Sequence, residues 1–85
     1  MNAYQVRKTE GVYPNIASYG VTHIINIQGS RGAYHSYYRY GDGHLNYCCG
    51  GADPASRRIA EEISNAIADP EHCKHQEVLS CMQGY

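Results

Sequence analysis

The chain has 85 residues, nine tyrosines, no phenylalanine or tryptophan, and a formal net charge of −1 at pH 7. This length predicts one small domain, residues 1–85, with a thin hydrophobic core, because short chains bury a small fraction of their surface. The near-neutral charge argues against an acidic DNA mimic and against a general polyanion binder, which would be clearly basic. Tyrosine must supply the aromatic bulk, and because each hydroxyl needs water or a partner, most of these side chains should lie half-buried.

Membrane and secretion signals are not evident in the sequence. No apolar run reaches the length of a membrane span. The N-terminal segment MNAYQVRK lacks the apolar region of a secretory signal. We therefore expect a cytoplasmic protein without a membrane partner, whose four cysteines are reduced.

The first half of the chain has the alternation of a β-sheet. Residues 3–8 alternate and predict an opening strand, whereas residues 9–20 read as a loop with room for a helical turn. Residues 21–28 are the strongest strand pattern, and residues 33–40 and 44–49 form the next two strands around a tight Gly-Asp-Gly turn. Val21, His23, Ile25 and Ile27 share one face of their strand, which we expect under a helix.

Residues 53–68 (DPASRRIAEEISNAIA) predict one amphipathic helix. Asp53 can cap its first turn, Pro54 suits the first helical position, and the Asp69-Pro70 pair ends it. Ile59, Ile63 and Ile67 recur every four residues, with alanines beside them, and should form the buried stripe.

The final apolar segment, residues 76–82 (QEVLSCM), is short and reads as an extra strand or an edge segment. The predicted architecture is therefore α+β, an antiparallel three- to four-stranded meander packed by one amphipathic helix.

The tyrosine-rich segment YHSYYRY is the most unusual feature. By alternation, one row of its side chains faces the helix and the other faces solvent. One interpretation is that these residues stabilise the sheet through cross-strand pairs. Exposed tyrosine with arginine also suits a protein contact surface, and a Tyr/Arg sheet face could stack single-stranded nucleic acid.

A second candidate contact surface is the charged outer side of the predicted helix. Together the two surfaces give the candidate partner-binding residues Arg31, Tyr34, Tyr37, Tyr38, Arg39, Tyr40, Arg57, Arg58, Glu61 and Glu62. For the strand, we expect that Tyr37→Ala with Arg39→Ala abolishes binding and leaves the fold intact.

The cysteines and histidines allow further alternatives. His72, Cys73, His75 and Cys81, with Cys48 or Cys49, could assemble a zinc-stapled interaction domain, although no C-x₂-C pair is present. For the cysteines, two other interpretations are a disulfide bond and a role as small buried apolar side chains. No nucleophile–base–orienter set and no phosphate loop is recognisable. We expect no enzyme, no cofactor and no resident metal.

The layout resembles that of small phage-encoded anti-defence proteins, the anti-CRISPR proteins among them. The features behind this are the MNAYQVRK strand, the YRYGDGHLNY hairpin and the SRRIAEEISNAI helix. The resemblance implies a non-enzymatic inhibitor in the host cytoplasm that occludes a surface of a nucleic-acid-targeting defence complex. We expect a protein partner, with self-association into a homodimer as an alternative and nucleic acid less favoured.

Overall fold

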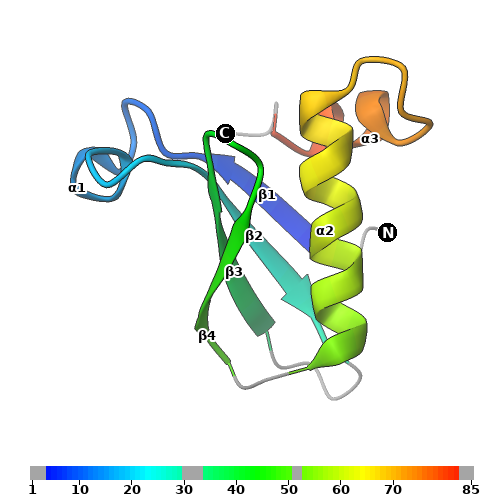
Figure 1. Cartoon of the computed structure of the whole chain (residues 1–85), viewed down its shortest axis with the longest axis horizontal. Coiled ribbons are helices and arrows are strands. Elements are labelled where there is room, and N and C mark those ends of the chain that lie inside the picture. The colour runs from blue at the N-terminus through cyan, green and yellow to red at the C-terminus, as the bar shows by residue number, and fades with distance from the viewer. Residues whose placement is uncertain (1–3, 30–33, 51–52, 83–85) are drawn as a thin grey trace.

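A computed structural model describes residues 4–29, 34–50 and 53–82. Four antiparallel strands form one sheet in the order β1-β2-β3-β4, with the bounds β1 Tyr4–Lys8, β2 Val21–Gln28, β3 Tyr34–Tyr40 and β4 Leu45–Cys49 (Figure 1). The helices are α1 Pro14–Ala17, α2 Pro54–Ala68 and α3 His75–Met82. This is an α+β fold built on a β-meander, as the sequence pattern predicted.

Helices α2 and α3 pack on the same face of the sheet (Figure 1). The core between these layers consists of Val6, Ile25, Ile27, Tyr37, Leu45, Ala60, Ile63, Ala66 and Val78. The strand register explains the sheet's share, because Val6 pairs with Ile25 and Ile25 with Tyr37, which places all three on one face. The prediction that Ile25 and Ile27 lie under a helix is confirmed.

The prediction of a strand at residues 76–82 is wrong, because the segment forms helix α3. Val78 and Met82 are four residues apart, and in a helix both reach the same core, where Val78 is fully buried. His75 Nδ1 also donates to the carbonyl of Ala66 (2.6 Å), which fixes the start of α3 against α2. None of the helices described is both long enough and apolar enough to cross a bilayer.

Helix α2 begins and ends where the sequence predicted. The Asp53 carboxylate accepts from the backbone N–H of Ala55 (3.1 Å) and from the Ser56 hydroxyl (2.8 Å). These two bonds satisfy donors of the first turn and lower the pKa of Asp53 below its usual value, the Ser56 bond contributing most.

The buried stripe of α2 differs from the predicted one. Ile63 is 1% exposed and Ile67 packs against the core, but Ile59 is 40% exposed. Ala66 lies on nearly the same side of α2 as Ile59, two turns later, and is fully buried where α3 covers the helix. The eight-residue α3 is short, and among the described residues no further helix covers the start of α2, to which we attribute the exposure of Ile59.

These two isoleucines give a matched test of the packing. Ile63→Ala should lower the free energy of unfolding by about 2–5 kcal/mol, because it removes buried methyl groups and leaves a cavity. Ile59→Ala should cost about 1 kcal/mol or less, because its side chain keeps much of its contact with water. Urea denaturation of both variants checks this, and equal losses would contradict the assigned stripe.

Candidate functional site: the uncovered face of the sheet

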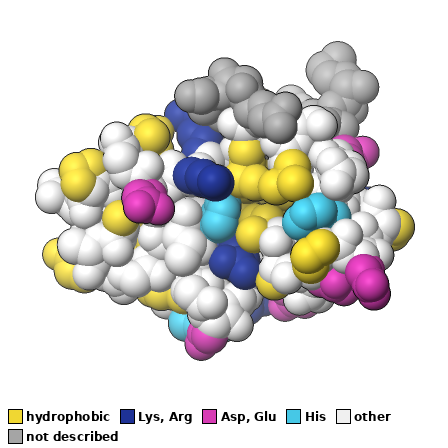
Figure 2. Space-filling model, turned by 90° about the horizontal axis from the view of Figure 1, so that it is seen from above, with side chains coloured by type: hydrophobic (Ala, Val, Ile, Leu, Met, Phe, Trp, Pro, Cys, Tyr) yellow, Lys and Arg dark blue, Asp and Glu magenta, His cyan; other side chains and the backbone are white. Residues whose placement is uncertain are grey.

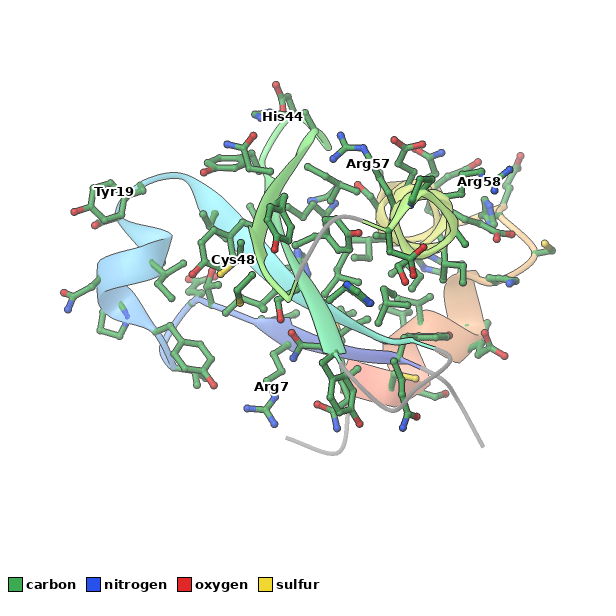
Figure 3. The ribbon with its side chains drawn as sticks, turned by 90° about the horizontal axis from the view of Figure 1, so that it is seen from below. Arg7, Tyr19, His44, Cys48, Arg57 and Arg58 are labelled. Carbon is green, nitrogen blue, oxygen red and sulfur yellow. The ribbon has the colours of Figure 1, made fainter. Side chains whose placement is uncertain are left out.

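The sheet face opposite α2 and α3 carries no covering helix in the part of the chain that the structure describes. The register places Gln5, Arg7, Ile24, Asn26, Tyr34, Ser36, Tyr38 and Asn46 on this face. Figure 3 shows Arg7 and Cys48 pointing away from both helices. We call this the open face. A hydrogen bond from Arg7 Nη1 to the hydroxyl of Tyr13 (3.0 Å) connects this face to the segment just before α1.

Three of the predicted contact residues lie on or at the border of the open face. Tyr34 is 46% exposed, and Tyr38 and Tyr40 are half-buried. Tyr40 belongs here because Asn46, which faces the same way, donates to its hydroxyl (3.3 Å). The sequence predicted that one of the two alternating rows of this strand faces solvent. In the structure this is the row that contains the three tyrosines.

Side chains of the open face are held by hydrogen bonds to one another. Ser36 donates to the Asn26 side-chain oxygen (2.6 Å), which links β3 to β2. The Tyr40 ring stacks on His44 with a centroid distance of 4.7 Å and an interplanar angle of 5°. A hydrogen bond from the Tyr38 hydroxyl to Cys48 is the main reason that the pKa of Tyr38 is raised, so this hydroxyl stays a donor. The face is thus ordered before any partner arrives.

The structure contradicts the expectation that Tyr37 and Arg39 form an exposed contact row. Tyr37 is 2% exposed and Arg39 is 6% exposed, and both belong to the helix-covered face. The cause is register: Tyr37 pairs with Ile25, whose face carries the core. Replacing both residues would therefore damage the fold, so the double substitution cannot test binding.

In the part of the chain that the structure describes, Arg39 donates its hydrogen bonds to neutral groups. Nε donates to the Ser64 hydroxyl (3.1 Å) and Nη1 to the Thr22 hydroxyl (2.9 Å). Ser64 in turn donates to the carbonyl of Gly43 (2.7 Å) in the β3–β4 turn. Among the residues described, no carboxylate lies within ion-pair distance of Arg39. Burial lowers the pKa of its guanidinium, which nevertheless remains charged at neutral pH.

His23 lies next to this network, and its ring Nδ1 is 2.8 Å from the Thr22 hydroxyl. Burial, followed by the charges of Arg39 and Lys8, lowers the pKa of His23 from 6.5 to about 4. The imidazole is therefore neutral at pH 7. The sequence interpretation of His23 as a packed, hydrogen-bonded histidine agrees with this position.

The outer side of α2 carries the other predicted contact residues. Arg57 and Arg58 are exposed. Arg57 lies on the side of α2 that faces β4, beside His44 and Tyr47, whereas Arg58 points away from the sheet (Figure 3). Arg57 pairs with Glu61 (3.2 Å), whereas Glu62 pairs with Lys74 (3.4 Å) of the α2–α3 connection. These are exposed pairs of small energetic value. Arg31, the last predicted contact residue, lies outside the described residues.

The described cysteines and histidines form no group of three or more candidate metal ligands. Cys48, Cys49, Cys73 and Cys81 form no disulfide. The sulfur atoms of Cys48 and Cys49 are 3.2 Å apart, although consecutive residues of a regular strand point to opposite faces. The pairing of β3 with β4 is irregular between Ser36 and Tyr37, opposite these cysteines, which accounts for the difference.

Several open-face residues were missing from the predicted set: Arg7, Asn26, Ser36 and Asn46. Their signal was present in the sequence, because the alternation of each strand assigns them to the face opposite Val6 and Ile25. The sequence pattern does not give the register in which the four strands pair. Comparisons of the chain with protein-family models, with curated proteins and with solved structures found no match.

The position of His23 predicts an acid-sensitive fold. An unfolded histidine has a pKa of 6.5, whereas the folded value is about 4, so in this window the unfolded chain binds the extra proton. The free energy of unfolding should therefore be highest above pH 6.5 and fall as the pH is lowered toward 4, by at most about 1.4 kcal/mol per pH unit. Urea titrations at half-unit pH intervals measure this slope.

His23→Gln is the control, because the amide keeps a hydrogen-bonding group and does not titrate. The variant should show a flatter profile between pH 6.5 and 4. Asp42 and Asp53 have pKa values lowered below 3.8, so the stability that they contribute is lost only at lower pH. An identical slope in His23→Gln would contradict the assignment.

Proposed function

We propose that this chain is a small, non-enzymatic protein-binding module that acts by covering a surface of its partner with the open face. The observation that carries the proposal is the solvent-facing row of Tyr34, Tyr38 and Tyr40 on a sheet face without a helix layer. Tyrosine offers a large contact area with a polar end and few rotatable bonds, which suits an anchor in a protein interface.

The ordered state of the open face supports this role. Association costs free energy for every side chain that must be immobilised, and side chains already held by hydrogen bonds reduce that cost. On the open face, the bonds Ser36–Asn26 and Asn46–Tyr40 hold polar groups in place within the isolated chain. Apart from Arg7, the polar side chains that the register assigns to this face are neutral, which suits the polar rim of a protein interface.

Protein is favoured over nucleic acid as the partner by the charge of this face. Among the described residues that the strand register assigns to it, Arg7 is the one cation, and it is hydrogen-bonded to Tyr13. A surface that follows a phosphate backbone needs several cations. Within this proposal, the finer role is that of an anti-defence inhibitor of the anti-CRISPR kind, occluding a surface of a nucleic-acid-targeting complex.

The test begins with affinity capture from host cells, identification of the retained protein, and calorimetric titration of that purified partner. Tyr34→Ala with Tyr38→Ala should weaken binding at least tenfold, because buried tyrosine anchors commonly contribute over 1 kcal/mol each. Tyr19→Ala is the matched control: Tyr19 is 80% exposed and lies outside the sheet, so affinity should not change.

Two outcomes would overturn the proposal. Wild-type affinity in the double variant, with unchanged stability, would remove the open face as the contact surface. Binding of single-stranded oligonucleotide with a steep salt dependence, lost in the same variant, would replace protein by nucleic acid as the partner. Sedimentation of the isolated chain separates self-association from binding to a foreign protein.

A further inference from the structure

A second surface, on the helix side of the sheet, carries a row of basic side chains. The strand register pairs Lys8 of β1 with His23 of β2, and His23 with Arg39 of β3. Directly opposed residues in antiparallel strands have Cβ atoms about 4.5–5.5 Å apart, and like charges at this spacing are destabilising. Figure 2 shows basic side chains on either side of a histidine, next to a hydrophobic patch.

A hollow of about 430 Å³ opens beside this row, between α1 and the sheet. Its polar wall includes Lys8, Thr9, Thr22 and His23. Glu10 is the one acidic side chain among the described residues that line it. The hollow has room for a group much larger than one water molecule, whose share of liquid volume is about 30 Å³.

The hydrogen bonds around Thr22 fix the tautomer of the His23 ring. The Thr22 hydroxyl donates to the carbonyl of Arg39 (3.2 Å) and accepts from Arg39 Nη1 (2.9 Å). Its hydrogen is thereby used, so His23 Nδ1 must donate to this oxygen. In the neutral ring, Nε2 then carries the lone pair, and protonation would add a second donor at Nε2.

We propose that Lys8, His23 and Arg39 form a binding site for a phosphate-type oxyanion. Lys8 is exposed on the wall of the hollow and supplies a mobile ammonium group. Arg39 does not line the hollow but lies behind Thr22, is 94% buried, and supplies a fixed charge. Among the described residues no carboxylate lies within ion-pair distance of Arg39, and Asp42 acts on it only from further away. An oxyanion would offset the repulsion among Lys8, Arg39 and a protonated His23, and it would accept from His23 Nε2 when that ring is protonated. Free phosphate and a small phosphomonoester share this chemistry, and the hollow has space for either.

Binding of the anion and protonation of His23 must be linked. The cations Lys8 and Arg39, after burial, depress the pKa of His23. An anion held among them acts in the opposite direction, so it raises the pKa of His23 and binds more tightly to the protonated ring. Glu10, on the wall of the same hollow, works against the ligand by its negative charge.

The experiment follows the ring carbon-bound protons of His23 by NMR over pH 3.5–7.5, with the resonance assigned through His23→Gln. Inorganic phosphate, glycerol phosphate and sulfate replace chloride at constant ionic strength, and sulfate keeps its charge over this range. Each oxyanion should give a saturable shift and raise the pKa of His23 by one unit or more. One unit corresponds to tenfold tighter binding by the protonated form.

Three variants decide whether the named residues form the site. Lys8→Ala should weaken oxyanion binding at least fivefold, and Glu10→Gln should strengthen it, since the two charges act with opposite signs. Lys74→Ala is the control, because its ammonium pairs with Glu62 on the far helices, and affinity should stay within twofold. All three positions are surface or half-buried, so the fold should persist, which thermal unfolding confirms.

Several results would overturn the proposal: a non-saturable response, a response equal to that in chloride, or wild-type affinity in Lys8→Ala. Saturation by glycerol phosphate and not by inorganic phosphate would identify an esterified phosphate as the ligand, and the reverse result would identify the free ion. The tyrosines of the open face do not take part, so failure here leaves the proposed protein binding intact.

Discussion

The hydrogen bonds of buried Arg39 join three parts of the fold that are distant in sequence. Its guanidinium reaches Ser64 in the middle of α2 and Thr22 at the start of β2, and Ser64 continues to the carbonyl of Gly43 in the β3–β4 turn. A buried donor without a partner costs about 1–3 kcal/mol, and more when it is charged. This requirement accounts for a serine on the buried side of α2 and for the irregular pairing between Val21 and His23, at which Thr22 lies.

The same interaction decides the character of both surfaces of the sheet. With Arg39 and Tyr37 under α2, alternation along β3 sends Tyr34 and Tyr38 to the opposite side. Arg39 is bonded to hydroxyl and carbonyl groups, and among the described residues no carboxylate lies within ion-pair distance of it, although Asp42 acts on it from further away. The register of β3 thus places the tyrosine row on one side of the sheet and Arg39, with the basic row, on the other.

Much of the fold could be read from the sequence, because its elements have local signals. The alternation of residues 21–28 gave the bounds of β2, and the cap at Asp53 gave the start of α2. The covered row of β3 could not be read in this way. Composition alone favours burial of the row that contains Tyr34, Tyr38 and Tyr40, because it is more apolar than the row of His35, Tyr37 and Arg39. In the structure it is the second row that the helices cover. The pairing of Tyr37 with Ile25 overrides composition, and register depends on turn geometry that no local pattern specifies. The short segment that forms α3 fits the periodicity of a helix and that of a strand about equally well. Only the structure, in which Val78 is buried, shows that it is a helix.

A single sheet also explains why so small a chain can hold its open face in order. Each tyrosine of that face is adjacent along β3 to a residue anchored in the other layer, as Tyr38 is to Tyr37 and Arg39. Backbone position is therefore fixed from beneath by packing against α2, while the hydroxyls are fixed from the side, as the Tyr40 hydroxyl is by Asn46. A thin core cannot cover both faces. Here the uncovered face is stabilised by polar cross-strand contacts, and its aromatic rings remain available to a partner.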